Sequence, residues 1–184
     1  MKVKKSSNLI ILEAQKAKAV FPLDPNKYKQ DDEHNVILAP VTKLPKSAKS
    51  LLIDNPGEFE ASDIFVYALT NEVDKVQLFS VDLDGINVMI FNSSDKILNL
   101  LDNDELPENN ILVCNINGDL GNVTDIIDEL EPNVLILTGK NEILLAESIK
   151  KLSLTPTDSQ TYYTFSDEDF AVEEGQPMKV VLLK

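Results

Sequence analysis

The chain offers few side chains that could act as nucleophiles, bases or metal ligands, and it scatters them. His34 is the single histidine, and the acidic residues just before it predict a solvent-exposed ring. Cys114 is the single cysteine and ends the apolar run 111–114, which favours a buried, inert thiol over a nucleophile. A serine nucleophile would have His34 as its one available imidazole base, so the sequence shows no recognisable catalytic triad.

Carboxylates are abundant, with 31 Asp and Glu residues, but their spacing fits no Ca²⁺-binding loop. The densest clusters are Asp102, Asp104, Glu105 and Glu108, and then Asp167, Glu168, Asp169, Glu173 and Glu174. A hydrolytic zinc site uses imidazole and carboxylate ligands around an open position, and one histidine cannot supply that set. The sequence therefore predicts solvated acidic faces, with no bound metal and no cofactor.

The net charge of −14 argues against a nucleic-acid partner or an anionic membrane, because both need a dense cationic footprint. All 17 basic residues are lysine, so the chain has no arginine to clamp phosphate or carboxylate groups. No stretch approaches the roughly 20 apolar residues of a membrane helix, and the first residues lack the apolar core and cleavage site of a signal peptide. Because one cysteine allows no internal disulfide, we expect a cytoplasmic protein.

Short β-rich runs fill the first half of the chain, separated by clusters of Pro, Lys, Asp and Asn. They cover residues 9–12, 17–21, 36–38, 51–53 and 64–69. Two further runs, residues 76–81 and 86–91, flank Asp84-Gly85, a pair suited to the positive φ angles of a tight turn. The sequence therefore predicts a β-hairpin over residues 76–91.

After the hairpin, strand and helix patterns alternate. Apolar residues recur at helical spacing over residues 97–101, with Ser94 or Asp95 as the expected N-cap, and over residues 126–130 and 143–152. Strands are expected at residues 111–114, 134–137, 162–165 and 179–183. This order favours one domain over residues 1–184, in which a mixed sheet is covered by helices.

A Gly-containing loop over residues 115–122 precedes the second of these helices. Backbone N–H groups at a helix start can hold an anion, but the spacing matches no phosphate-binding motif. Asn122 as an ordinary N-cap and Asp125 in the first turn account for the same residues. We therefore expect a structural loop.

One segment links this organisation to a known family. Residues 52–60 read Leu-Ile-Asp-Asn-Pro-Gly-Glu-Phe-Glu, which resembles the dGPGEYE signature of a branch of metallo-β-lactamase-fold hydrolases related to the ascorbate-phosphate lactonases. Residues 76–88 resemble the hairpin of that branch, and residues 111–136 echo its strand, Gly-containing loop, helix and E-P strand. The resemblance spans roughly residues 8–184 and implies an αββα sandwich, in which two mixed β-sheets are flanked by helices.

The resemblance also implies a metal site whose ligands this chain lacks. The family's H-x-H-x-D-H run is replaced by residues 39–45, which read Ala-Pro-Val-Thr-Lys-Leu-Pro. Its bridging aspartate is missing near Ser93, and its last histidine is replaced by Thr138-Gly139-Lys140. Three ligand segments are lost together, and lysine cannot replace them because an ammonium group has no free lone pair.

These losses predict a catalytically inactive protein of this fold, acting as a structural or protein-interaction module through a protein partner or self-association. Two alternatives stay open: a hydrolase with rewired metal ligands, and a module that binds a small ligand in the family's former catalytic cleft. The residues expected at that cleft are Asp54, Pro56, Gly57, Glu58, Ser93 and Gly139. For residues 56–58, a structural role in a tight turn is the simpler explanation.

Overall fold

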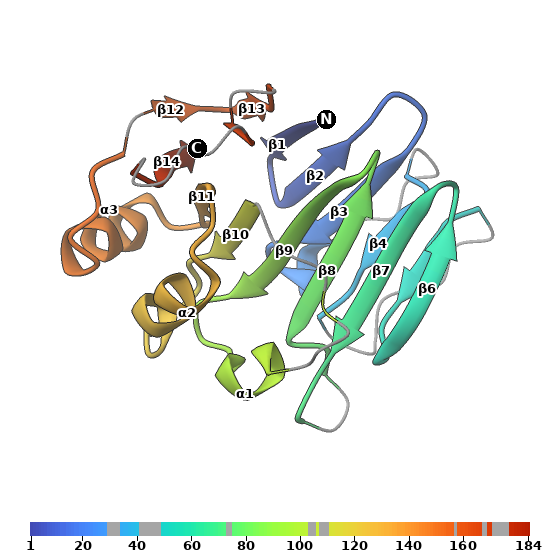
Figure 1. Cartoon of the computed structure of the whole chain (residues 1–184), viewed down its shortest axis with the longest axis horizontal. Helices are drawn as coiled ribbons and strands as arrows, with labels where there is room; N and C mark the ends of the chain where they lie inside the picture. Colours follow the sequence, from blue (N-terminus) through green and yellow to red (C-terminus); the bar gives the residue numbers. More distant parts are fainter. Residues whose placement is uncertain are drawn as a thin grey trace.

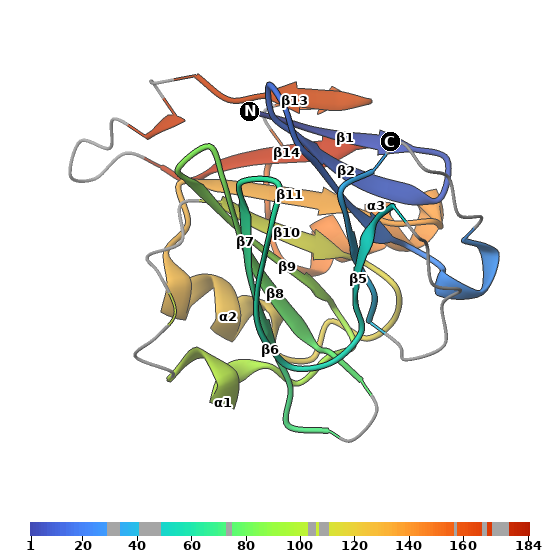
Figure 2. The ribbon, with the colours of Figure 1, turned by 90° about the vertical axis from the view of Figure 1, so that its right-hand side faces the viewer.

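The computed structural model describes residues 1–184 except 29–33, 41–48, 73–74, 103–105, 107–110, 157, 167–168 and 171–176. Its strands form a six-stranded first sheet and an eight-stranded second sheet that face each other (Figures 1 and 2). The first sheet contains, in spatial order, β13 (Tyr162–Thr164), β1 (Lys2–Ser6), β2 (Leu9–Glu13), β3 (Lys18–Pro22), β4 (Val36–Leu38) and β5 (Leu51–Ile53). The second sheet contains β12 (Asp158–Gln160), β14 (Lys179–Leu183), β11 (Val134–Thr138), β10 (Ile111–Asn115), β9 (Ile86–Asn92), β8 (Leu78–Leu83), β7 (Ile64–Leu69) and β6 (Gly57–Ala61). The helices are η1 (Pro25–Lys27), α1 (Leu98–Leu101), α2 (Val123–Leu130) and α3 (Glu142–Lys151).

Both sheets are mixed, and their parallel parts fix where the strands end. In the first sheet β3, β4 and β5 run parallel, whereas the other neighbours pair antiparallel. In the second sheet β9, β10, β11 and β14 run parallel, and β6 to β9 form an antiparallel meander. Because parallel neighbours end at the same edge of a sheet, the carboxyl ends of β9, β10 and β11 lie together.

The main core lies between the two sheets, where alternate residues of each strand point inward. Ile10 and Phe21 come from the first sheet, and Phe79 and Val81 come from the second. The rings of Phe21 and Phe79 meet edge to face, with centroids 6.0 Å apart. Burying each large apolar side chain contributes roughly 1.5–3 kcal/mol, so this layer holds the sheets together.

The described α-helices cover the outer face of the second sheet (Figures 1 and 2). Met89 and Leu135 of the strands belong there to one apolar cluster with Ile126 of α2 and Leu145 of α3. Within the described part of the chain, no helix is long and apolar enough to cross a membrane.

The outer face of the first sheet carries a smaller apolar cluster. Tyr28, which follows η1, packs there with Ile11, Val20 and Ile37. The expected sandwich of two mixed sheets with helices is thus confirmed, and the α-helices that the structure describes lie against the second sheet.

The predicted hairpin is confirmed. β8 and β9 join through Asp84 and Gly85, whose φ angles are +57° and +74°. A second hairpin of the same kind joins β6 and β7 through Ser62 and Asp63, whose φ angles are +54° and +61°. The sequence does not predict this second turn, because it has no glycine to mark the left-handed positions.

Strand β1 is absent from the sequence-based expectations because its lysines hide its alternation. Val3 points into the core and is fully buried. Across the antiparallel neighbours, Glu13 lies within 3.3 Å of the ammonium groups of Lys2, Lys4 and Lys18. One carboxylate therefore offsets the repulsion among three strand lysines.

Three local predictions are wrong. His34 is buried rather than exposed, because it lies two residues before β4, which is placed between β3 and β5. Helix α1 begins after Ile97 without a side-chain cap, so neither Ser94 nor Asp95 caps it. Asn122 holds the N-cap position of α2, but its side chain makes no capping hydrogen bond.

Candidate functional site

Three polar residues end neighbouring strands of the second sheet. Asn92 ends β9, Asn115 ends β10 and Thr138 ends β11, and the parallel register places them side by side. All three are buried, and the hydroxyl of Thr138 donates to the carbonyl of Leu183 at 3.0 Å. In sheets with parallel strands, ligands bind in the crevice outside the carboxyl ends. This edge is therefore the candidate site.

A chain of hydrogen bonds connects two of these residues, Asn92 and Asn115, to the surface. Lys75 Nζ lies 2.5 Å from Asp95 Oδ1, and Asn92 Nδ2 donates to Asp95 Oδ2 at 2.9 Å. Asn115 Nδ2 then donates to Asn92 Oδ1 at 2.8 Å. Asp95 and the two amides are each buried, so this network replaces hydration at the end of the strands.

The last atom of the network is not satisfied within the described residues. Asn115 is 1% exposed, and its Oδ1 has no hydrogen-bond partner among them. Leaving a buried acceptor unpaired costs about 1–3 kcal/mol. Asn115 also lines a cleft, so a molecule in that cleft can supply the missing donor.

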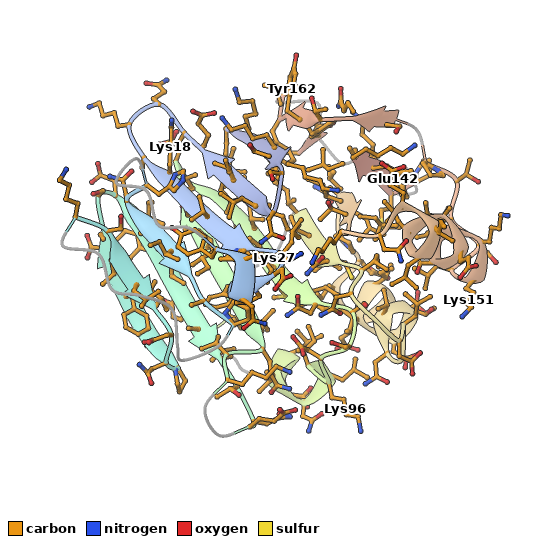
Figure 3. The ribbon with its side chains drawn as sticks, turned by 180° about the vertical axis from the view of Figure 1, so that it is seen from behind. Lys18, Lys27, Lys96, Glu142, Lys151 and Tyr162 are labelled. Atoms are coloured by element: carbon orange, nitrogen blue, oxygen red, sulfur yellow. The ribbon has the colours of Figure 1, made fainter. Side chains whose placement is uncertain are left out.

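The cleft opens between the ends of the two sheets and has a volume of about 700 Å³. It is lined by the last residue of β10 and by residues that follow β3, β10 and β11: Leu23, Asp24, Pro25, Asn115, Ile116, Asn117, Lys140, Asn141, Glu142 and Leu144. Figure 3 labels Lys27, which belongs to η1 after β3, and Glu142, which begins α3, so that both sides of the cleft can be located. Apolar and polar side chains therefore share this cleft.

Charged groups bridge the two sheets beside the cleft. Lys140 Nζ lies 2.5 Å from Asp24 Oδ2. The hydrogen bond from Lys140 lowers the pKa of Asp24, and the same hydrogen bond raises the pKa of Lys140. Lys5 Nζ donates to the carbonyl of Gly139 at 2.6 Å, and burial lowers the pKa of Lys5 against an opposing effect of the Glu142 charge.

Two of the predicted cleft residues, Ser93 and Gly139, lie at this edge. Ser93 directly follows β9 and is buried, and its hydroxyl donates to Asn117 Oδ1 at 3.3 Å and accepts from Asn117 N at 3.2 Å. Gly139 directly follows β11, and a Cβ at this position would lie 2.7 Å from the carbonyl oxygen of Ile116. Ser93 thus orders the loop after β10, and Gly139 lets that loop approach.

None of the six predicted residues belongs to the cleft lining itself, and the other four also lie away from this edge. Asp54 follows β5 of the first sheet and accepts a hydrogen bond from Asn55 Nδ2 at 2.6 Å. Pro56, Gly57 and Glu58 are exposed, and the last two begin β6, the edge strand of the second sheet. Gly57 has a φ of +143°, which agrees with the structural explanation of this turn.

The sequence does not single out Asn92, Asn115 or Asp24 as site residues. Its one available signal is an apolar run that ends in Asn, as in Phe91-Asn92 and Cys114-Asn115. That signal is weak, because Asn also follows strands simply as a turn residue.

Cys114 precedes Asn115 in β10 and is fully buried, as its apolar neighbours predict. Burial raises the pKa of its thiol, and the nearby charge of Asp95 raises it further. The thiol therefore stays protonated and takes no part in the site.

Comparisons with known proteins identify the fold. No model of a protein family matches the chain, and no curated protein matches it. A solved structure from Thermotoga maritima, a proposed Zn-dependent hydrolase of the metallo-β-lactamase superfamily, is similar with a TM-score of 0.65. The match has 15% sequence identity and covers 99% of this chain and 97% of that chain. This chain has the metallo-β-lactamase fold.

The residues at the carboxyl ends of β9, β10 and β11 do not suit zinc, the metal in that protein's name. Zinc takes thiolate, imidazole and carboxylate ligands. The strand ends of this metallo-β-lactamase fold carry Asn92, Asn115 and Thr138, with the ammonium groups of Lys5 and Lys140 nearby. Among the described residues, no group of three or more His, Cys, Asp or Glu side chains could hold a metal ion. Residues 41–45, which replace most of the first ligand run, lie outside the described residues.

Proposed function

We propose that this protein is a catalytically inactive member of the metallo-β-lactamase fold, which acts by binding a small molecule in the cleft at the carboxyl ends of β10 and β11. The observation that carries the proposal is the unpaired, buried Oδ1 of Asn115, a residue that is 1% exposed and belongs to the lining of that cleft. A buried acceptor is retained at little cost where a donor from a bound molecule satisfies it, and an ordered water can fill the same place until a ligand displaces it.

The dimensions of the cleft support a small molecule. Pockets for small ligands usually enclose about 300–1,000 Å³ and combine apolar walls with a few convergent polar groups. The cleft of about 700 Å³ has Leu23, Ile116 and Leu144 as apolar walls beside Asn115 and Asn117.

A protein partner and self-association have less support from the surface. The large exposed apolar residues of the described part are Phe65, Ile143 and Tyr162, which belong to β7, α3 and β13. Single apolar residues on separate elements are normal for a soluble surface and do not mark an interface. We therefore favour the cleft over the surface as the place where the protein acts.

Two experiments test the proposal. In the first, the purified protein is incubated with excess zinc and with phosphodiester, lactone and β-lactam substrates. We expect no turnover above that of zinc without protein, and turnover that is lost on chelation would refute inactivity. In the second, small fragments are titrated against ¹⁵N-labelled protein, and we expect some to shift the resonances of Asn115, Ile116 and Asn117. A broad fragment set that leaves all three unshifted would refute the binding role.

A further inference from the structure

We infer that the cleft selects an uncharged or cationic small molecule that presents an N–H or O–H donor to Asn115 Oδ1 beside an apolar body. The inference rests on the proposed function and deepens it by naming the chemical class of the ligand. It follows from the direction of one hydrogen-bond chain and from the charges around the cleft.

The direction of the chain is set at its buried end. An ionised carboxylate only accepts hydrogen bonds, so Asp95 requires the Nδ2 group of Asn92 to face it. Asn92 Oδ1 is then turned toward Asn115 and requires the Nδ2 group of Asn115. Consequently the NH₂ group of Asn115 is used within the network, and its oxygen is the atom left to accept a hydrogen bond from a ligand. Lys75 fixes this order, because its ammonium group pairs with Asp95.

The surrounding charges disfavour an anionic ligand. The carboxylates of Asp24 and Glu142 line the cleft, and the ammonium groups beside them are already engaged: Lys140 pairs with Asp24, and Lys5 interacts with the charge of Glu142. The whole chain has a net charge of −14, which adds long-range repulsion of anions. A carboxylate or a phosphodiester group would also present only acceptors to Asn115, which already offers an acceptor itself.

The apolar walls define the rest of the ligand. Leu23 follows β3 of the first sheet, whereas Ile116 follows β10 of the second sheet and Leu144 lies in α3. An apolar body between them removes its own surface from water, and one polar group then suffices to fix its orientation.

The test compares three probes of similar size by ¹H–¹⁵N spectroscopy at mildly alkaline pH. Indole has an N–H donor and no ring acceptor, benzofuran replaces that N–H by an oxygen, and isoquinoline has a ring acceptor and no donor. We expect indole to shift the Asn115, Ile116 and Asn117 resonances and to bind about tenfold more tightly than the other two probes, the usual value of one hydrogen bond.

The variant Asp95→Asn reverses the chain without changing its shape. Lys75 still donates to the remaining oxygen, and the introduced NH₂ group donates to Asn92 Oδ1. Asn92 then donates to Asn115, whose NH₂ group turns toward the cleft. We expect the preference to reverse, so that isoquinoline binds more tightly than indole. The matched control Asp169→Asn changes a buried carboxylate that pairs with Lys179 and does not line the cleft, and indole should stay preferred.

The outcomes separate the two proposals. Equal binding of indole and benzofuran in the cleft of the wild-type protein would overturn the inferred selection for an N–H or O–H donor, here called the donor rule, but would keep the binding function. The same holds for a folded Asp95→Asn variant that still prefers indole. Absence of any shift at the cleft with all three probes would overturn the donor rule, and with a wider fragment set also the binding function. If Asp95→Asn does not fold, the wild-type comparison of indole with benzofuran decides.

Discussion

Gly139 is a residue at which the structure leaves no room for a side chain. It is buried directly after β11, and a Cβ would meet the carbonyl oxygen of Ile116 at 2.7 Å. We expect Gly139→Ala to lower the free energy of unfolding by about 1–3 kcal/mol, since both backbones would have to move. Urea unfolding measures the change.

Gly118→Ala is the matched control for this substitution. A Cβ at Gly118 would make an ordinary contact at 3.6 Å with the Cβ of Ser94. Its effect should stay within about 0.5 kcal/mol, as for most surface changes. Equal losses in the two variants would contradict the steric explanation for Gly139.

At the residue scale, the sequence predicts the surroundings of a side chain where its neighbours in the chain determine them, and fails where distant strands do. The buried state of Cys114 follows from its apolar neighbours. The burial of His34 and the unpaired oxygen of Asn115 do not, because both depend on strands that lie far away in sequence. Asn115 meets Asn92 only through the parallel register of β9 and β10, and periodicity within one segment carries no such information.

Helices α2 and α3 begin at asparagines that differ in what their side chains do. Asn141 Oδ1 accepts hydrogen bonds from the backbone N–H groups of Ile143 and Leu144, whereas Asn122 makes no side-chain cap. We expect Asn141→Ala to cost about 1 kcal/mol of unfolding free energy, and Asn122→Ala to cost much less. Thermal unfolding of both variants checks this, and a larger loss in Asn122→Ala would contradict the capping geometry.

The lysine-rich end of the first sheet makes the stability depend on pH through Glu13. The hydrogen bond from Lys18, with help from Lys4 and Lys2, lowers the pKa of Glu13 to about 2. A depressed pKa means that the contribution is complete above the ordinary glutamate value near 4.5 and is lost as the pH falls toward about 2.

Glu13→Gln measures that contribution. We expect the variant to be less stable than the wild type by about 1 kcal/mol at neutral pH, the scale of a partly exposed ion pair, and the difference to shrink from about pH 4.5 downward and to disappear below about pH 2. Glu60→Gln is the control, because Glu60 is exposed in β6 and makes no ion pair within the described residues. A difference between Glu13→Gln and the wild type that does not change with pH would contradict the assignment.

At the element scale, the sequence predicts strands that consist of an apolar run, and misses strands of polar composition that only their neighbours hold in the sheet. The sequence predicts β4, β5, β7 and β14 with the bounds that the structure has. Strands β1 and β6 escape prediction because their alternating lysines and glutamates read as surface. Their pairing partners, not their own composition, hold them in the sheets.

At the scale of the whole molecule, the fold is easier to predict from the sequence than the site is. The order of strands and helices predicts two mixed sheets with helices, and the sheets and a solved structure of similar fold confirm this. The site is less predictable, because it lies where the ends of β3, β10 and β11 meet across both sheets. Asp24 and Lys140 are 116 residues apart in the chain and 2.5 Å apart in space.

The most direct test of a binding site without a metal centre is the metal content of the protein. The chain is produced in medium supplemented with zinc, manganese and iron, dialysed without chelator, and analysed by inductively coupled plasma mass spectrometry. Because no three His, Cys, Asp or Glu side chains of the described residues gather closely enough to hold a metal ion, we predict no stoichiometric transition metal and no change in melting temperature on chelation. About one or more metal ions per chain, lost on chelation together with stability, would contradict the proposal and favour a hydrolase with rewired ligands.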